Sequence, residues 1–433
     1  MKKILLFGVL VVFAANLFPG FNVNHYKLKN GLTVILSPEK DAGSICIMVY
    51  HKNGVRDDPP SIRGASYLYQ TLMFLGTKNL APYERILFIK KNGGRSSGRI
   101  NYDNSIFYQV VPDNDVNYAL WLESERLKSL NLSGSNITEQ KNATYRRIYN
   151  ISNRSVHFRA SSWINREIFK NTVYSTPLYG ELEKINSFDN NSIRKLYTSF
   201  NNPQNIIIVI SGHFDEEDIR GKINRYFSDL YSAGPPSRDI LPSKIAGEYV
   251  YKNWMRELLP EHFILYGIKA PSKLNMDYLY FDFLKYYLVD KRVSKLNRIF
   301  KSTLKMNVKI SYESSDNIGA NALIIKVASP KRAELEKMRI YMNQIFSMLS
   351  SSRLTTSEVK AIKSLMEVDY LKKLSTLEGR SHVLAENFHI SGSLDKENNY
   401  VRRLRKLNSY DLQRISKKYF TKKNLVILNV FSK

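Results

Sequence analysis

The chain has 433 residues, of which 43% are hydrophobic, so it has enough apolar side chains for two packed domains and is not globally disordered. Its formal net charge is +26, but Lys and Arg are spread along the chain without a finger or RNP-like motif, so specific nucleic-acid binding is not expected. The single cysteine, Cys46, excludes an intramolecular disulfide and a cysteine zinc cluster.

The N-terminus has the pattern of an export signal. Lys2-Lys3 precede the apolar run Ile4–Phe18, which has the length of a signal-peptide core and is shorter than the roughly 20 residues that span a bilayer. Residues 1–20 are therefore interpreted as a signal peptide or, because no clean A-x-A cleavage site follows, as an uncleaved anchor that attaches the protein to a membrane. Both interpretations predict an exported protein, periplasmic or associated with the envelope.

The first third of the mature chain mixes strand and helix patterns. Apolar residues alternate around the Asn30-Gly31 turn dipeptide, which predicts a hairpin over 25–36. The apolar run 45–50 predicts a buried strand that contains Cys46. Residues 64–75 repeat Leu at helical spacing and predict a helix. Further along, a strand is expected over 106–111 and helices over 118–130 and 137–150.

The chain is predicted to consist of two related halves. A Gly-, Pro- and Ser-rich linker at 232–245 separates an N-terminal domain, 22–231, from a C-terminal domain, 246–433. Residues 185–210 and 407–428 share one plan: a Ser at the expected helix N-cap (Ser187 and Ser409), a helix, an aromatic residue, an Asn and a β-branched strand. Strands and helices do not alternate strictly, so each half is predicted to be α+β.

Several short motifs, in order, resemble the pitrilysin (insulinase-like) family of zinc metallopeptidases. Residues 28–34 follow the opening-strand pattern L-x-N-G-L-x-V. The segment Gly64–Thr77, GASYLYQTLMFLGT, is similar without a gap to the family pattern GLAHFLEHMLFKGT. Gly93-Gly94 with Asp103, the GHFD of 212–215 and the stretch 377–430 also fit. The resemblance implies two homologous α/β sandwich domains, each a mostly antiparallel sheet with helices on one face.

The resemblance also implies that every catalytic residue is replaced. In the family, two His one helical turn apart and a later Glu bind zinc, and a Glu between the two His acts as general base. Here the His positions correspond to Tyr67 and Thr71, the general base to Gln70 and the third ligand to Arg147. A neutral phenol, a hydroxyl, an amide and a guanidinium are poor substitutes, so zinc binding is not expected and the chain is predicted to be an inactive homologue.

Four further positions correspond to the family's peptide cleft. The family's Asn-Ala beside its edge strand corresponds to Ser97-Gly98, and an Arg and a Tyr of its second half correspond to Lys301 and Val308. Backbone pairing of an extended peptide with the strand near Ser97-Gly98 needs no catalytic residue. A peptide ligand therefore stays compatible with the lost zinc site.

Two functions follow from these observations. The favoured one is a partner subunit or a peptide- or protein-binding module outside the cytoplasm. Because two subunits enclose a chamber in this family, a homodimer or a heterodimer with a pitrilysin-like subunit is expected. The alternative is an active hydrolase with a different catalytic set, for example a metal at His382, Glu386 and His389, which fall at i, i+4 and i+7 of a predicted helix.

Overall fold

The computed structural model describes residues 22–232, 249–256, 259 and 261–432. The predicted signal segment, 1–20, and the predicted linker apart from Ser232 lie outside the described residues. Within the described part, no helix combines the length and the apolar character that crossing a membrane requires.

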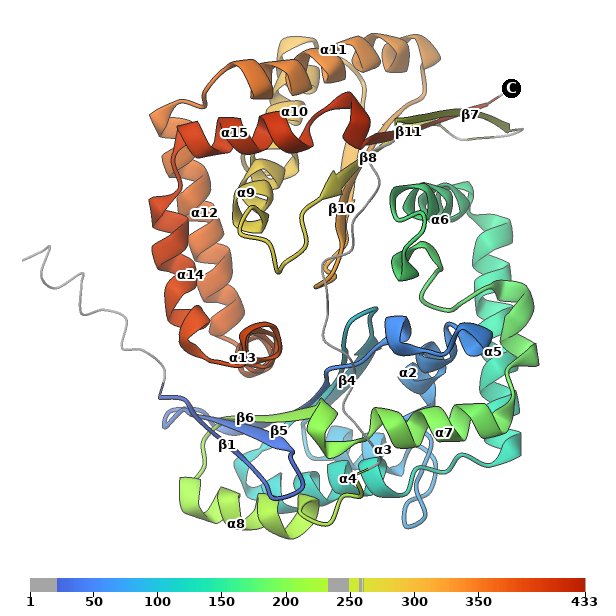
Figure 1. The fold of residues 1–433 in the computed structure, drawn as a ribbon, viewed down its shortest axis with the longest axis vertical. Coiled ribbons are helices and arrows are strands. Elements are labelled where there is room, and N and C mark those ends of the chain that lie inside the picture. Colours follow the sequence, from blue (N-terminus) through green and yellow to red (C-terminus); the bar gives the residue numbers. More distant parts are fainter. Residues whose placement is uncertain (1–21, 233–248, 257–258, 260, 433) are drawn as a thin grey trace, which may run out of the picture.

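Two mostly antiparallel sheets form the frame of the protein (Figure 1). The first sheet has the strand order β1-β2-β6-β3-β5-β4 and the second has the order β7-β11-β8-β10-β9. The parallel pairs are β2 with β6 and β11 with β7, and the other pairs are antiparallel. The strands of the first sheet are β1 (Asn24–Lys27), β2 (Thr33–Pro38), β3 (Ser44–His51), β4 (Arg95–Ile100), β5 (Ser105–Pro112) and β6 (Ile206–Gly212). Those of the second are β7 (Val250–Arg256), β8 (His262–Ala270), β9 (Lys309–Ser314), β10 (Asn321–Ser329) and β11 (Leu425–Ser432).

The two sheets share one topology once β1 is set aside. In order, β2, β6, β3, β5 and β4 correspond to β7, β11, β8, β10 and β9. The segments 185–210 and 407–428, whose similar patterns predicted a duplication, end in the equivalent strands β6 and β11. The predicted hairpin is also present, because β1 pairs with β2 around Gly31, whose φ of +89° is open to glycine at no steric cost.

Helices of each half cover one face of its own sheet. On the first sheet these are α2 (Tyr69–Leu72), α3 (Glu84–Lys91), α4 (Val116–Lys128), α5 (Gly134–Arg154), α7 (Asn190–Phe200) and α8 (Glu216–Phe227). On the second they are α9 (Tyr278–Val289), α11 (Arg332–Ser351), α12 (Thr356–Leu374) and α15 (Ser409–Tyr419), with α10 (Lys295–Asn297) and α14 (Asp395–Lys406) beside them. Strand alternation sets this arrangement: Ile45, Ile47 and Val49 of β3 face the helices, and Cys46, Met48 and Tyr50 face the other way.

The opposite face of each sheet is covered by a helix from the other half. The helix α13 (Leu377–Ser391) buries Leu384 and Ala385 against Met48 and Val209 of the first sheet. In return, α6 (Val156–Ile168) buries Ile164 and its apolar neighbours against the second sheet. Figure 1 shows α13 lying over the first sheet and α6 beside β8. Each half's own helices therefore cover one face of its sheet, as predicted. The second face of each sheet is covered by one helix from the other half, α13 or α6.

A buried carboxylate, Asp103, also joins the halves. It lies between β4 and β5 and accepts hydrogen bonds from the backbone N–H groups of Ile318 at 2.6 Å and Gly319 at 3.1 Å, both in the second half. Its other oxygen accepts a bond from the Tyr174 hydroxyl at 2.7 Å. The Asp of the family-like motif is thus a structural link, a role that the sequence did not reveal.

Local structure differs from prediction at two kinds of position. The residues that cap α7 and α15 are Asp189 and Asn408, whose side chains accept bonds from the backbone N–H groups of Ser192 and Asp411, so the predicted Ser187 and Ser409 caps are wrong. The predicted helix over 64–75 is also shorter. It is a 3₁₀ turn over Ala65–Leu68 followed by the single-turn helix α2, and Gly64, whose φ is +100°, immediately precedes it.

Candidate functional site

The segment that corresponds to the family's zinc helix is held by buried contacts. The Asp58 carboxylate accepts hydrogen bonds from the backbone N–H groups of Gly64 at 2.9 Å and Ser66 at 3.1 Å, and from the Ser66 hydroxyl. Burial raises the pKa of Asp58 to about 7, against the lowering effect of these bonds. Leu68, Tyr69 and Leu72 then pack into the core, which leaves Tyr67, Gln70 and Thr71 half-buried on the outer side.

Two of the four residues that correspond to the family's zinc site contact each other. Arg147 of α5 donates a hydrogen bond to the Tyr67 hydroxyl at 3.1 Å, and its guanidinium carbon lies 5.5 Å from the centre of the Tyr67 ring. Positions 67 and 147, which the family resemblance links to two of the zinc ligands, therefore lie next to each other in this structure. The Thr71 hydroxyl donates to the Leu68 carbonyl at 3.0 Å, as hydroxyls in helices often do.

This set of side chains does not fit a zinc ion. Zinc in proteins takes imidazole, thiolate or carboxylate ligands, and none of the four positions supplies one. The Arg147 guanidinium lies over the Tyr67 ring as a cation–π partner. A dication beside it would be repelled, so no catalytic step is assigned to this site.

The strand β4, which carries Ser97 and Gly98, is an edge of the first sheet. It pairs with β5 alone among the described strands, with Ser97 opposite Tyr108 and Gly98 opposite Phe107. Only glycine fits at position 98, because a Cβ atom there would lie 2.5 Å from the Phe107 ring. The predicted edge strand is thus present, and its outer backbone groups point away from the sheet, where a further strand would add.

A hollow of about 260 Å³ lies beside this edge strand. Its walls are Ser97, Gly98 and Arg99 of β4, the β3 and β5 side chains below them, and Glu378 and His382 of α13, with Lys373 at the end of α12. Arg95 forms an ion pair with Glu378 at 2.9 Å, and Arg99 donates a hydrogen bond to His382 at 2.8 Å. Sequence reasoning missed Arg99 and Lys373, although the alternation of Arg95, Ser97 and Arg99 along a predicted edge strand was a usable signal.

The three α13 residues proposed as an alternative metal site each bind a different element. Arg99 contacts His382, Lys273 forms an ion pair with Glu386 at 2.9 Å, and the Tyr50 hydroxyl lies 2.9 Å from His389 Nδ1. In the part of the chain that the structure describes, no group of three His, Cys, Asp or Glu side chains is placed to hold a metal. The alternative metal site is therefore wrong, because tertiary packing turns these side chains toward separate partners.

The second-half cleft positions are also placed differently from the prediction. Val308 is 3% exposed and packs in the core of the second domain, so it does not line a peptide cleft. Lys301 lies on an exposed π-helical turn, Arg298–Thr303, and lines a separate hollow with Arg298 and Glu358. The family-based correspondence at these two positions is the part of the site prediction that the fold does not support.

Comparison with known proteins agrees with this fold. Residues 33–181 match the insulinase (peptidase family M16) family, and residues 187–366 match the peptidase M16 inactive domain. The chain belongs to the insulinase (M16) peptidase family. A relative and a solved structure each match more than nine-tenths of this chain.

Among relatives, the chain is 22% identical to the zinc protease PqqE of Helicobacter pylori over 91% of this chain and 89% of that protein. It is 20% identical to the beta subunit of the mitochondrial-processing peptidase of Saccharomyces cerevisiae over 58% of this chain and 55% of that protein. Among solved structures, a protease from Helicobacter pylori gives a TM-score of 0.84 at 18% identity and covers 95% of this chain and 99% of that chain. The periplasmic protease PqqL of Escherichia coli gives 0.75 at 13% identity, with 96% of this chain matching 48% of that chain.

Proposed function

We propose that this M16 family member works without zinc, as a binding subunit that captures extended peptide segments along β4 outside the cytoplasm. The observation that carries the proposal is the contrast between two neighbouring features. The Tyr67–Arg147 pair lies at positions that correspond, by the family resemblance, to two metal ligands, whereas β4 pairs with β5 alone among the described strands. Strand addition needs only such an edge and side-chain pockets beside it.

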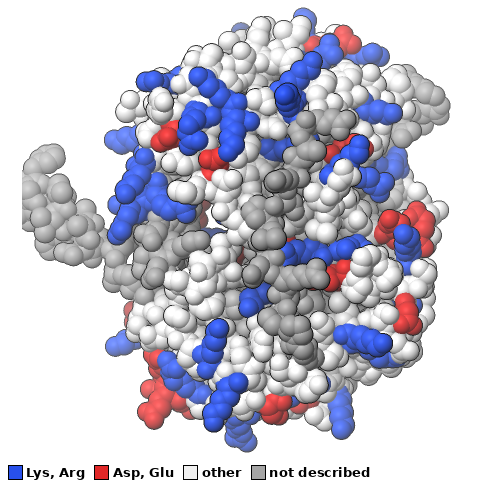
Figure 2. All heavy atoms as spheres, viewed as in Figure 1, with Lys and Arg blue, Asp and Glu red and all other residues white. Residues whose placement is uncertain are grey.

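Export is part of the proposal. Lys2-Lys3 and the apolar run that follows support it, and the similar PqqL of Escherichia coli is described as periplasmic. The protein face in Figure 2 carries Lys and Arg over both halves with Asp and Glu among them, which favours a broad attraction for acidic partners over one dense nucleic-acid surface.

The peptide site is tested by a disulfide cross-link. The Ser97→Cys variant adds one accessible thiol, because the native Cys46 is fully buried. A peptide paired antiparallel with β4 brings the Cα atom of the opposite residue to about 4.5–5.5 Å from that of residue 97, which a disulfide can span. We expect a cysteine-containing extended peptide to cross-link to this variant in a thiol redox buffer, as measured by intact-mass spectrometry.

The matched control is Ser311→Cys on β9, the equivalent edge strand of the second sheet. Stronger cross-linking at position 97 than at 311 supports a site on β4. Equal yields at both positions, or none at either, would contradict a specific peptide site there.

Assembly with a second subunit is proposed on a structural argument. PqqL carries about twice the length of chain, and this chain matches 48% of it, so a partner of equal size would restore that amount of structure. We expect a homodimer, or a heterodimer with a catalytic pitrilysin-like subunit captured from the native envelope. Light scattering at micromolar concentration should give twice the mass of one chain, and a monomer that captures no such subunit would count against assembly.

A further inference from the structure

Two cations without a carboxylate of their own flank one side of β4. Arg99 projects from the strand toward α13 and contacts the neutral His382 ring, and Lys373 lies across the hollow at the end of α12. Within the described part of the chain, neither side chain takes part in an ion pair, whereas Arg95 on the same strand is paired with Glu378. The hollow therefore carries excess positive charge beside the strand edge.

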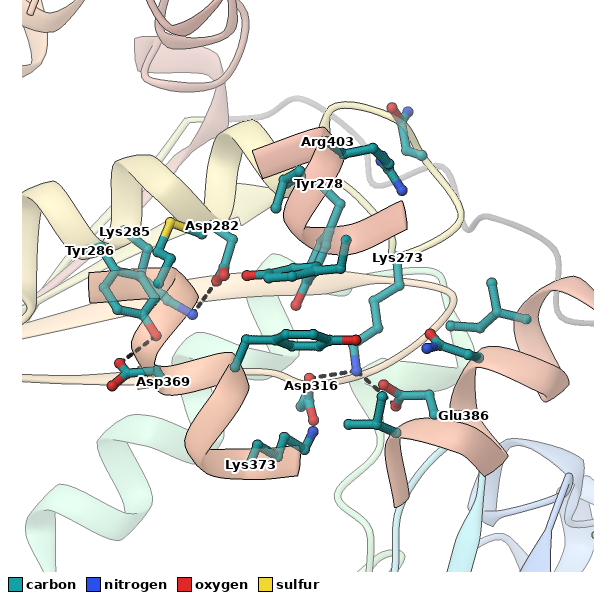
Figure 3. Close-up of a pocket in the computed structure, with 18 residues that line it drawn as sticks. Lys273, Tyr278, Asp282, Lys285, Tyr286, Asp316, Asp369, Lys373, Glu386 and Arg403 are labelled. Atoms are coloured by element: carbon teal, nitrogen blue, oxygen red, sulfur yellow. Dashed lines mark hydrogen bonds and ion pairs between the residues drawn. The ribbon is translucent and has the colours of Figure 1, made fainter. Parts of the chain in front are cut away.

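The two carboxylates that attract Lys373, Glu386 and Asp316, are already engaged by another lysine. Lys273, whose side chain is 8% exposed, forms ion pairs with Glu386 at 2.9 Å and with Asp316 at 2.6 Å. Figure 3 shows Lys373 beside this group, at the edge of an adjoining cavity of about 480 Å³ that it shares with Lys273, Asp316 and Glu386. The pKa of the Lys373 ammonium is lowered, because the loss of water around it outweighs the attraction of Glu386 and Asp316.

The geometry of strand addition sends alternate side chains of a ligand to the two faces of the sheet. Side chains level with Arg95, Ser97 and Arg99 would point toward the α13 side, where Lys373 and Arg99 lie. Those level with Gly98 would point toward the side of Phe74 and α2. The α2 side carries a third cation outside any ion pair of the described residues, Arg147, so both faces favour negative charge.

We infer that the β4 site selects extended peptides that carry carboxylate side chains, with Arg99 and Lys373 as the recognising cations. The inference rests on the proposed peptide-binding function and adds the class of ligand. A carboxylate between Arg99 and Lys373 would gain charge-assisted hydrogen bonds and would relieve the repulsion between the two cations. An amide of the same shape would gain neither.

The test compares two peptides on the full mature protein. One is a fluorescein-labelled peptide of about six residues, the usual length of a strand, in which Glu alternates with Val. The other has Gln in place of each Glu. Fluorescence anisotropy should show that the Glu peptide binds about three- to fivefold more tightly than the Gln peptide at low ionic strength. This difference should shrink toward about 0.15 M salt, where charges are screened.

Substitutions of the two cations test whether they cause the preference for the Glu peptide. Lys373→Met, which removes the charge and keeps most of the length of the side chain, should abolish most of the preference for the Glu peptide over the Gln peptide. Arg99→Gln should act in the same direction. The control Lys360→Met removes the same charge from an exposed position elsewhere on α12 and should keep the preference.

The possible results distinguish a failure of the carboxylate preference from a failure of peptide binding itself. Equal binding of both peptides would leave peptide capture standing and overturn the carboxylate preference. A preference for Glu that survives both Lys373→Met and Arg99→Gln would overturn the assignment to these cations. No binding of either peptide would overturn the proposed function and this inference together.

Discussion

Tyr67 and Arg147 occupy the positions of two metal ligands and still lie together, at 3.1 Å between the guanidinium nitrogen and the phenol oxygen. By the family resemblance, these two positions correspond to ligands that would have to lie close together, and the contact agrees with that correspondence. Substituting these side chains tests whether the backbone here could hold zinc if it carried the ligand residues of the family. Arg147 is the decisive residue, because a guanidinium donates hydrogen bonds and offers no lone pair to a metal.

We predict that the native protein binds no stoichiometric zinc and that the variant Tyr67→His, Gln70→Glu, Thr71→His, Arg147→Glu binds about one zinc per chain. Elemental analysis after dialysis measures this. The triple variant that keeps Arg147 is the control, and its retained positive charge should prevent tight binding. Zinc in the native protein, or none in a folded quadruple variant, would show that the correspondence with the family's ligands is wrong.

At the scale of elements, the halves are joined because α13 packs on the sheet of the first half and α6 packs on the sheet of the second half. Leu384 of α13 is fully buried against the first sheet, although it follows the second domain's own helices in the chain. Lys273 and Glu386 tie the same helix to the second domain. The helix is therefore anchored on both sides, and weakening its packing should be felt in both halves.

Leu384→Ala should lower the free energy of unfolding by about 2–5 kcal/mol, as truncation of a buried leucine commonly does. Far-UV circular dichroism and tryptophan fluorescence, to which Trp121 of α4 and the Trp163–Trp254 pair of α6 and β7 contribute, should shift together in urea. Val368→Ala on α12, where the side chain is 44% exposed, is the matched control and should change stability by less than about 0.5 kcal/mol. Separate transitions in the two signals would mean that the halves unfold independently.

At the scale of the whole molecule, buried imidazoles set the pH range of stability. Burial lowers the pKa of His51 to about 3, of His382 to about 4 and of His389 to about 3. An unfolded histidine has a pKa of about 6.5, so below that pH the unfolded chain binds more protons than the folded one and stability falls. Asp58, with its pKa raised to about 7, acts in the opposite direction and gains stability as pH falls from about 7 toward 4.

Three histidines outweigh one carboxyl group, so we predict that the free energy of unfolding is about 2 kcal/mol or more lower at pH 5 than at pH 7. Urea denaturation at a series of pH values measures the slope. His389→Gln should make that slope shallower by about 1.4 kcal/mol per pH unit, whatever its effect on overall stability. A stability that is flat or rises as the pH falls would contradict the prediction.

The sequence by itself determined the features that depend on local pattern. The Asn30-Gly31 hairpin and the buried strand around Cys46 follow from residues close together in the chain. The edge strand at Ser97-Gly98 came from the resemblance to the family and is present, whereas the replacement of the zinc ligands stays a prediction from the same resemblance. Turn chemistry and alternation act over a few residues, and a single chain displays them directly.

Tertiary structure alone decided where side chains distant in sequence meet. It placed Val308 in the core, separated His382, Glu386 and His389 onto different partners, and brought Lys373 opposite Arg99. A helical repeat shows that residues share a face, but not which surface that face meets. Because α13 packs on the sheet of the other half, its neighbours are set by long-range burial of apolar area, which no local pattern in this sequence encodes.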